Sequence, residues 1–593
     1  MPIDSIPARL YARAKEMGSE PAYYEKVDGD WVSTDWSTYA AEVTQAAKAM
    51  IALGVEPGHT VCILGFNRAE WVIFDVAAMA IGAVPAGIYT TCSPNEVQYI
   101  VDHSEAGLVL LEDQGQWEKI LAERERLPAL RQVITMRGAA SIDDDLVLGW
   151  AEFLANGDGV DDAVVDERLS QLTEEQLATF IYTSGTTGPP KAVMLTHGNL
   201  SWTAGAALEL VRLTPEDCSL SYLPLSHIAE QMFTIHAPIS IGSAVYFAES
   251  IDDVPENLKE VQPTVFFGVP RIWEKFYSAV NAKLSGATGV KAKLVAFAMA
   301  NAAKVSDLRN HGRDPGMWLA ARYALGKKLV LNKVKPALGM GRARVCVSGA
   351  APVSADILRF FSGLDLIILE VYGQSEDTGP TTFNRPGATR YGTVGPRIPG
   401  IDVKIAEDGE ILVKGPNVFK GYYKDEAATA AALTDGWLHS GDLGEFDEEG
   451  FLSITGRKKD IIITAGGKNI APKNIEAALK GHDVVGEAVV IGDRRKFLSA
   501  LITLDPDGAE RFASEHGIST DGLHESTSLI AELQTHIENS VNTLFARVEH
   551  IRKFKVLSEP FSIEKGELTP TLKIKRNKVN ENYASVIDSM YDD

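Results

Sequence analysis

Cysteine and positive charge are both scarce in this sequence of 593 residues, and each shortage argues against a class of protein. The four cysteines show no paired spacing of the kind that binds zinc, and so few thiols are typical of a reduced compartment. Lysine and arginine number 57 against 80 acidic residues, so a net charge of -23 disfavours nucleic acid as the main partner. We therefore predict a cytoplasmic protein that binds neither zinc nor nucleic acid.

Long apolar runs are also lacking. The N-terminus has no apolar segment of the kind that a signal peptide needs. The most apolar stretch, residues 72–88, is slightly short for a membrane span and contains Asp75, Gly82 and Pro85. We expect this stretch to form a buried helix and a turn instead.

The chain is too long for one hydrophobic core, so we expect at least two domains. Helical and strand patterns alternate over residues 1–176, which predicts a mainly parallel α/β sheet. Residues 392–423 are rich in glycine and proline and predict turns and short strands. The composition changes at 456–460, so we place a large N-terminal domain at 1–457 and a small α/β domain at 458–593.

The strongest chemical pattern is Tyr182-Thr-Ser-Gly-Thr-Thr-Gly-Pro-Pro-Lys191, which lies between two β-favouring runs. Its glycines let backbone N–H groups approach an anion, its hydroxyls add further donors, and Lys191 adds a full positive charge. It is not a Walker loop, because that loop has four residues between its glycines and leads into a helix. The pattern predicts a phosphate-binding loop between two strands, with a flexible surface turn as the alternative.

Two further segments place small residues and single polar groups at the ends of predicted strands, where open α/β sheets bind nucleotides. Small residues at 349–351 leave room for a purine base, and Tyr372 offers it a flat face. Glu376 offers a hard oxygen ligand for magnesium that is already held by phosphates. Taken alone, Glu376 is more often an ordinary surface carboxylate.

Together these segments resemble the AMP-forming adenylate synthetases, and the resemblance covers nearly the whole chain. The segments that follow in family order are Tyr222-Leu-Pro-Leu-Ser-His-Ile228, Tyr372-Gly-Gln-Ser-Glu376, Trp437-Leu-His-Ser-Gly-Asp442, Gly456-Arg-Lys-Lys-Asp460 and Gly566-Glu-Leu-Thr-Pro-Thr-Leu-Lys573. The most similar branch is that of the long-chain and very-long-chain acyl-CoA synthetases, which includes the bubblegum type. Ala192 replaces the usual glycine and Ser375 the usual threonine, and each keeps the small or hydroxyl character of its site.

The resemblance implies the family's fold: a large domain of α/β sheets with a β-rich part, followed by a small mobile α/β domain. It also implies a site for ATP and magnesium, with Lys191, Glu376 and Lys573 as the catalytic residues and Thr183 as a second metal ligand. The other residues expected to contact the nucleotide are Thr183, Ser184, Gly185, Thr186, Thr187, Gly188, Gly349, Ala350, Ala351, Tyr372, Gly373, Gln374, Ser375, Asp442 and Arg457.

Two residues are implied to contact the acid substrate. His227 falls in the segment that lines the acid's pocket in the family, and we expect it to position the substrate rather than to transfer a proton. Trp273 falls near the aromatic residue that gates the fatty-acid tunnel of the long-chain members. A histidine or a tryptophan that is simply part of the core is the alternative for each.

In the family the small domain moves, and the resemblance implies a pivot at Lys459. Gly466 and Lys468 fall where relatives contact CoA, and Lys573 falls where they place a mobile catalytic lysine. A hairpin turn is the alternative for Lys468, and a solvated tail lysine is the alternative for Lys573.

Residues 271–344 differ from the rest of the chain, because 15 lysines and arginines face three acidic residues there. The segment is therefore +12, and -23 minus 12 leaves -35 on the remainder. A solvated basic face is the simplest interpretation. The alternatives are docking of the CoA phosphates or peripheral contact with an anionic membrane that supplies fatty acid.

We therefore predict a long-chain fatty acid–CoA ligase with ATP, magnesium and CoA as cofactor and co-substrates. The fatty acid and ATP give acyl-AMP and pyrophosphate, and CoA then gives acyl-CoA and AMP. No cysteine or serine nucleophile site is evident, so no covalent enzyme intermediate is expected. The alternatives are a ligase for medium-chain or aryl acids, a ligase that stops at acyl-AMP, and a non-catalytic nucleotide-binding or membrane-associated scaffold.

Overall fold

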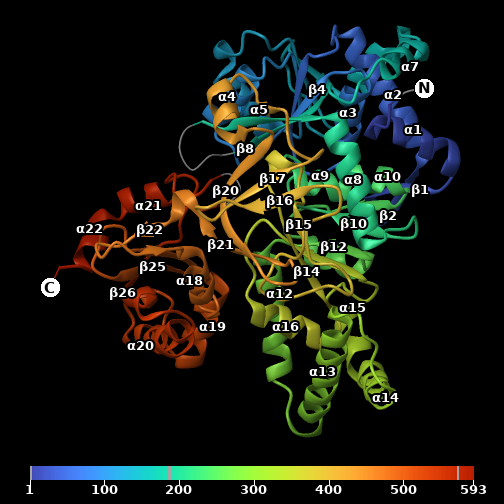
Figure 1. Ribbon diagram of the computed structural model, residues 1–593. Coiled ribbons are helices and arrows are strands. Elements are labelled where there is room, and N and C mark those ends of the chain that lie inside the picture. The colour runs from blue at the N-terminus through green and yellow to red at the C-terminus, as the bar shows by residue number, and fades with distance from the viewer. Residues whose placement is uncertain (1–2, 184–188, 570–572, 593) are drawn as a thin grey trace.

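The computed structural model describes residues 3–183, 189–569 and 573–592, and its largest sheet has eight strands (Figure 1). Their order is β18-β9-β8-β4-β3-β5-β6-β7. The strands are β3 (Thr60–Leu64), β4 (Val84–Ile88), β5 (Leu108–Leu111), β6 (Gln132–Thr135), β7 (Val147–Gly149), β8 (Leu177–Thr183), β9 (Lys191–Thr196) and β18 (Gly421–Tyr422). The pairs from β8 through β7 are parallel, which confirms the predicted α/β class. The pairs β8–β9 and β9–β18 are antiparallel.

Helices cover both faces of this sheet. Alternate side chains of a strand point to opposite faces, so Ile63 packs in one hydrophobic cluster and Leu64 in another. The first cluster includes helices α2 (Trp36–Ala52) and α3 (Ala69–Ala80), and the second includes α4 (Pro94–His103) and α5 (Gln114–Ala122).

The apolar stretch at 72–88 was predicted to be a helix and a turn, which the structure has at α3 and at residues 81–82, but the prediction missed the strand that follows. Every residue of α3 is buried, but residues 84–88 form β4, between β3 and β8. Pro85 lies inside this central strand, where proline normally signals a turn. The hydroxyl of Thr179 on β8 donates to the carbonyl of Pro85 at 3.0 Å.

Two four-stranded sheets continue the large part of the chain. One has the order β10-β11-β1-β2 and the other the order β12-β13-β14-β15. Their strands are β1 (Pro21–Val27), β2 (Asp30–Asp35), β10 (Cys218–Ser221), β11 (Ala244–Phe247), β12 (Val265–Phe267), β13 (Val345–Ser348), β14 (Ile368–Tyr372) and β15 (Thr382–Phe383). Because β12, β13 and β14 are parallel, their carboxyl ends meet at one edge of the sheet.

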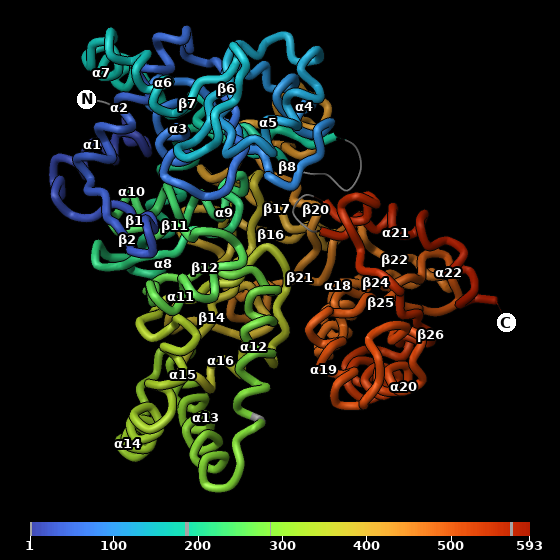
Figure 2. Tube along the Cα trace, turned by 180° about the vertical axis from the view of Figure 1, so that it is seen from behind, coloured from blue at the N-terminus to red at the C-terminus, as the bar shows by residue number. Residues whose placement is uncertain are grey.

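A group of helices extends from the second of these sheets, away from the eight-stranded sheet (Figures 1 and 2). It consists of α12 (Pro270–Ser285), α13 (Gly289–Asn310), α14 (Met317–Gly326), the π-helical turn η4 (Lys327–Leu331), α15 (Asn332–Ala337) and α16 (Ala355–Gly363). We call residues 289–337, from α13 through α15, the helical arm. Over the described part of the chain, no helix combines the length and hydropathy needed to cross a membrane.

The predicted β-rich part is a five-stranded antiparallel sheet with the order β16-β17-β20-β19 and β21 paired to β20. Its strands are β16 (Asp402–Ile405), β17 (Glu410–Lys414), β19 (Leu433–Thr434), β20 (Trp437–Phe446) and β21 (Leu452–Arg457). This sheet therefore ends at the residue where the large domain was predicted to end.

The remainder of the chain, in orange and red in Figure 1, forms a smaller α/β unit. Its strands are β22 (Ile462–Ile463), β23 (Asn469–Ile470), β24 (Val485–Ile491), β25 (Leu498–Leu504) and β26 (Ile551–Val556), and its helices include α18 (Pro472–Leu479), α19 (Pro506–His516), α20 (Thr527–His536), α21 (Arg576–Asn582) and α22 (Ala584–Ser589). Two hydrophobic clusters have all their buried members at or beyond residue 462. A core of its own supports the proposal that 458–593 is a separate domain.

Asp75 lies inside α3, where neither carboxylate oxygen has a hydrogen-bond partner among the described residues, and burial raises its pKa well above the ordinary 3.8. The folded state therefore binds this proton more tightly than the unfolded state, and the contribution of Asp75 to stability falls as the pH rises above 3.8. We predict that Asp75→Leu raises the free energy of unfolding by about 1–3 kcal/mol at pH 8 and by less at pH 5. Urea unfolding at the two pH values measures this.

The control for this prediction is Asp143→Leu, which changes an exposed aspartate. A gain for Asp75→Leu that is equal at both pH values would contradict a protonated, desolvated carboxyl group at this position.

Candidate active site

The predicted phosphate loop joins β8 to β9, and the two strands form an antiparallel pair as expected. Thr183 and Lys191 are directly opposite each other, and the Thr183 hydroxyl donates to the Lys191 carbonyl at 3.4 Å. The predicted phosphate contacts between them lie outside the described residues: Ser184, Gly185, Thr186, Thr187 and Gly188.

Lys191 meets a strand that comes more than 200 residues later in the chain. β18 pairs with β9, and its Tyr422 ring lies under the ammonium group, with 4.9 Å from Nζ to the ring centroid. Nζ is also 3.6 Å from Asp425 Oδ2. The Tyr422 hydroxyl donates to Glu376 Oε1 at 2.8 Å, so one tyrosine links the two predicted catalytic residues. Burial and the Glu376 charge raise the pKa of Tyr422, which keeps this donor protonated.

Glu376 lies in the short helix η5 (Ser375–Asp377), which is stabilised by hydrogen bonds to Asp377 and by close backbone packing at Gly373. The buried Asp377 carboxylate accepts from the Gln374 N–H at 2.6 Å and from the Thr381 hydroxyl. Burial raises the pKa of Asp377 to about 8. A Cβ on Gly373 would overlap the Gly379 carbonyl oxygen, so only glycine allows this close approach.

Asp442 lies on β20 directly opposite Arg457 on β21, and the Arg457 Nε is 2.9 Å from Asp442 Oδ1. The other carboxylate oxygen, Oδ2, accepts from the Tyr372 hydroxyl at 3.0 Å and from Gln374 Nε2 at 2.6 Å. Gln374 Nε2 also donates to the Ser440 carbonyl at 2.8 Å. Three residues that were predicted to contact the nucleotide therefore all contact the buried Asp442 carboxylate: Tyr372 on β14, Gln374 in the turn after β14, and Arg457 on β21.

Tyr372 was expected to offer a flat face to a purine, and its hydroxyl bond to Asp442 fixes the orientation of the ring. Burial and the Asp442 charge raise the pKa of Tyr372, so the hydroxyl remains a donor. Gly349, which follows β13, lies close against β14: a Cβ added to it would be 2.6 Å from Val371 Cγ1. Ala350 has a φ of 68°, which is rare for a residue with a side chain and often marks a functional site.

Lys573 reaches this group from the smaller unit. Its backbone N–H donates to the Thr569 hydroxyl at 3.0 Å, and residues 568 and 574 form an isolated β-bridge. Surrounding protein and the positive charges of Arg457 and Lys473 lower the pKa of Lys573, while Glu376 and Asp442 oppose that shift. The side chain nevertheless remains accessible to solvent. The tail lysine thus shares one electrostatic environment with the Glu376 and Asp442 carboxylates.

His227 precedes helix α9 (Ile228–Gln231) and lies within electrostatic range of Lys573. Burial and the Lys573 charge lower the pKa of His227 to about 4, so the ring is neutral at neutral pH. Its Nδ1 accepts from the Ala229 N–H at 3.1 Å, which places the ring proton on Nε2. A neutral ring with one N–H donor fits the predicted positioning role.

Glu230 anchors the segment that carries His227, and sequence reasoning missed it. Its buried carboxylate accepts from the Ser221 hydroxyl at 3.1 Å, the Tyr222 N–H at 3.1 Å and the Thr234 hydroxyl at 2.9 Å. Burial raises the pKa of Glu230 to about 7. Tyr422 and Asp377 were missed too, because a single tyrosine or aspartate in a short segment carries no pattern that points to a distant partner.

Trp273 lies in the core beneath the third sheet. Its side chain is fully buried, its indole N–H donates to the Gly268 carbonyl at 3.0 Å, and its ring packs edge-on against Phe266 and Phe361. A gating movement of Trp273 would have to break these contacts.

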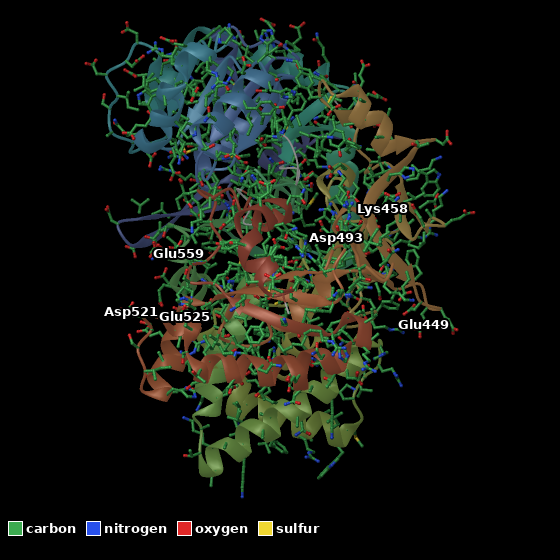
Figure 3. All side chains as sticks on the ribbon, turned by 90° about the vertical axis from the view of Figure 1, so that its left-hand side faces the viewer. Glu449, Lys458, Asp493, Asp521, Glu525 and Glu559 are labelled. Carbon is green, nitrogen blue, oxygen red and sulfur yellow. The ribbon has the colours of Figure 1, made fainter. Side chains whose placement is uncertain are left out.

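The three remaining predicted residues follow β21 and are exposed. Lys459 lies in the short helix η6 (Lys458–Asp460), where the preceding Lys458, labelled in Figure 3, is 2.6 Å from Asp408 and 2.9 Å from Glu410. Gly466 and Lys468 lie in an exposed turn, where the Lys468 N–H donates to the Thr464 hydroxyl at 3.2 Å. Lys573, from the same smaller unit, lies within electrostatic range of Glu376 and Asp442.

The residues near Glu376 fit magnesium of the kind that is bound partly by a substrate. No group of three or more candidate metal ligands occurs among the described residues. Magnesium is commonly held by one or two carboxylates together with phosphate oxygens, so one carboxylate beside a phosphate loop is a suitable protein contribution. The four cysteines are all buried, and burial raises the pKa of Cys62, Cys92 and Cys346 to about 12, which is unsuited to a nucleophile.

Solved structures share this arrangement of a large α/β part and a smaller C-terminal unit. The adenylation domain of a carboxylate reductase from Mycobacterium chelonae superposes with a TM-score of 0.76 at 20% identity, covering 100% of this chain and 94% of that one. ATP-bound MatB from Rhodopseudomonas palustris superposes with a TM-score of 0.70 at 23% identity, covering 99% and 100%. At these identities the likeness establishes the fold of an adenylate-forming enzyme.

Sequence comparison then defines the family. Residues 10–423 match the model of the AMP-binding enzymes, and residues 459–593 match that of the AMP-binding enzyme C-terminal domain. The long-chain-fatty-acid–CoA ligase ACSBG2 of Xenopus laevis is 38% identical over 610 residues, covering 97% of this chain and 82% of the relative. The long-chain-fatty-acid–CoA ligase FadD15 of Mycobacterium tuberculosis is 37% identical over 597 residues, covering 99% and 97%. This chain belongs to the AMP-binding enzyme family.

We predict that Gly373→Ala lowers the free energy of unfolding by about 2 kcal/mol or more, because the added methyl group displaces the turn that carries Glu376. Urea unfolding measures the change. Gly205→Ala is the matched control, since that glycine lies inside helix α8 (His197–Val211) with no atom within 4 Å of an added Cβ. The control should gain up to about 1 kcal/mol. Equal effects of the two substitutions would show that the close approach at residue 373 is unimportant.

Proposed function

We propose that this protein is an AMP-forming long-chain fatty acid–CoA ligase, in which the residues described above bind ATP and the acid. The observation that carries the assignment of the site is electrostatic: Lys573, from the smaller unit, lies within range of the charges of Glu376, Asp442 and Arg457 from the large one. The sequence resemblance to long-chain-fatty-acid–CoA ligases over nearly the whole chain supports the choice of acid and of CoA as acceptor.

In the first half-reaction the main obstacle is repulsion between two anions. A fatty acid is already ionised at neutral pH, so it needs no base, but its carboxylate must approach the negatively charged α-phosphate of ATP. One carboxylate oxygen bonds to the α-phosphorus while the bond to the bridging oxygen breaks, and the leaving pyrophosphate keeps the electron pair. Lys191 and Lys573 supply positive charge where negative charge accumulates.

Glu376 would hold magnesium, with Thr183 as a second ligand, and the bound metal would neutralise charge on the phosphates of ATP. The Tyr422 hydroxyl bond orients the Glu376 carboxylate, and the same ring supports the Lys191 ammonium group. Tyr422 therefore positions the metal ligand and the phosphate-binding lysine together.

The nucleoside is held by groups at the ends of β13 and β14 and by Asp442 on β20. Asp442 accepts a hydrogen bond from the ribose, because a carboxylate that is already oriented by Arg457, Tyr372 and Gln374 presents its remaining lone pair in a fixed direction. The purine lies against Tyr372 and the small residues Gly349, Ala350 and Ala351, next to the turn at Gly373 and Ser375.

His227 positions the acid, since its neutral ring donates a hydrogen bond from Nε2 and adds no charge.

In the second half-reaction the CoA thiol loses its proton, its sulfur bonds to the acyl carbon, and AMP leaves with the electrons of the mixed-anhydride bond. We propose that the 458–593 domain turns about Lys459 between the two steps, withdrawing Lys573 and bringing Gly466 and Lys468 to CoA.

The basic segment 271–344 lies largely outside this site, in the helices from α12 to α15. Of the two roles considered for it, docking of CoA phosphates and contact with an anionic membrane, we favour the membrane, because the helical arm points away from the eight-stranded sheet (Figure 2).

The overall assignment is tested with purified protein, ATP, magnesium, CoA and a panel of acids from acetate to long-chain fatty acids. We expect AMP and an acyl-CoA thioester to appear together, with the highest kcat/KM for long chains. Formation of acyl-AMP without thioester would favour an acyl-AMP ligase, and a preference for aryl acids would overturn the choice of substrate.

We predict that Lys573→Ala lowers fatty-acid-dependent exchange between ATP and pyrophosphate by about 100-fold or more, the effect expected for a charge aimed at the transition state. The same variant should still convert supplied acyl-AMP to acyl-CoA at a rate within about threefold of the unmodified protein. Lys578→Ala, whose side chain pairs with Glu581 on α21, is the control for changes in this region. Equal losses in both half-reactions would exclude the proposed division between them.

We predict that Glu376→Ala raises the magnesium concentration needed for half-maximal exchange by about tenfold, which corresponds to about 1.4 kcal/mol. Tyr422→Phe keeps the ring under Lys191 but removes the donor to Glu376, and it should shift the same titration in the same direction by a smaller factor. Magnesium titrations of the exchange reaction measure both shifts. A titration that neither substitution moves would show that Glu376 does not hold the metal.

A further inference from the structure

The helical arm has an exposed apolar face on α14. Met317 is 93% exposed, Trp318 76%, Leu325 51% and Leu329 41%. The last three lie at positions i, i+7 and i+11 along one continuous helix, and this spacing places them on one side. The other eight tryptophans of the chain are buried or half-buried, so Trp318 is unusual for this protein.

This exposure does not come from a loosely packed helix. The opposite side of α14 is buried against α13, where a Cβ on Gly326 would be 2.9 Å from the Ala298 backbone. Tyr323 is buried as well, with the Arg309 guanidinium 5.3 Å from its ring centroid. The apolar residues therefore face outward from a helix whose inner side is fixed, which is typical of a surface that meets a partner.

The helical arm also carries exposed positive charge. Arg309, Lys327 and Lys335 share one acid, since all three lie within 3.6 Å of the Asp365 carboxylate. Others are exposed and have no ion pair within 4 Å among the described residues: Lys291, Lys293, Lys304, Arg313, Lys328 and Lys333. Figure 3 shows nitrogen-tipped side chains extending outward from these green helices.

We infer that the outer face of α14 and η4 inserts shallowly into the surface of an anionic lipid bilayer, with Trp318 and Leu325 among the lipid headgroups and the neighbouring lysines on the phosphates. Tryptophan favours this interfacial region because its ring is apolar and its N–H remains hydrated. A helix with an apolar face flanked by lysine and arginine is the usual form of a peripheral membrane contact.

The charge distribution favours a bilayer over a second copy of this chain. Two arms brought face to face would each carry ten basic against two acidic residues, a net charge of +8, whereas an anionic surface attracts that charge. The remaining charge, -23 minus 8 or -31, is repelled by the same surface, so the protein would meet the membrane with the arm foremost. The inference rests on the proposed function only for its purpose, which is that the protein takes its poorly soluble acid from the membrane. The binding test below uses no ATP, CoA or fatty acid, so its outcome is independent of the proposed function.

The first test is co-sedimentation of the full chain with vesicles of phosphatidylcholine alone or with phosphatidylglycerol added. We expect binding to the anionic vesicles only, with at least a tenfold weaker Kd at high salt. Trp318→Ser with Leu325→Ser should weaken binding at least tenfold, and so should Lys328→Glu with Lys333→Glu. The matched controls are Leu544→Ser with Val548→Ser, which are 68% and 46% exposed, and Lys15→Glu with Lys496→Glu. The controls should bind as the unmodified protein does.

The second test locates the contact. Brominated phospholipids should quench tryptophan fluorescence of the bound protein, and Trp318→Phe should remove most of that quenching while leaving acyl-CoA formation from a soluble acid unchanged. Equal binding to neutral and anionic vesicles would overturn the inference, as would full binding by either arm variant. A dimer detected by light scattering that Trp318→Ser abolishes, without vesicle binding, would show instead that a second copy covers this face.

Discussion

The carboxylate of Asp442 is the interaction on which the candidate site depends. Its oxygens pair with Arg457 on β21 and accept hydrogen bonds from Tyr372 on β14 and Gln374 in the turn after β14. One buried anion therefore connects two sheets and the strand that leads to the smaller unit. Such a group is costly to bury unless every partner is in place. Once they are, the carboxylate is fixed in one orientation, which the proposed recognition of a ribose requires.

A second set of contacts joins the metal ligand to the phosphate loop. Lys191 and Glu376 are 185 positions apart, and the Tyr422 ring and hydroxyl contact both of them. The buried Asp377 and the close approach of Gly373 to Gly379 hold the turn beneath Glu376. Tyr422 thereby links the lysine and the glutamate, while the Lys191 ammonium group pairs with Asp425 at 3.6 Å.

Charge is distributed unevenly over the molecule. The chain outside residues 271–344 carries the acidic excess, while the 271–344 segment, most of which forms helices that extend from the body, has a net charge of +12. Asp365 pairs with three of these basic residues, while others are exposed and have no ion pair among the described residues, so they remain available to an anionic surface.

The sequence by itself determined the class of fold and most of the local structure. The alternation of patterns correctly indicated the parallel strands β3 and β5 with helices between them, and the hairpin of β8 and β9 followed from two β-favouring runs around a polar loop. These features depend on neighbouring residues, so a linear pattern contains them. The motif residues Glu376, Asp442 and Arg457 could be named for the same reason, and their assigned roles stay predictions.

Tertiary structure alone decided which distant groups meet. Pro85 lies in a central strand because its neighbours in the sheet supply the pairing that a local pattern cannot show. Tyr422, Asp377 and Glu230 acquire their importance from partners brought to them by folding, and the outward direction of Trp318 depends on how α14 packs against α13. The physical reason is that burial, hydrogen-bond partners and exposure are properties of a three-dimensional neighbourhood, which residue order alone does not specify.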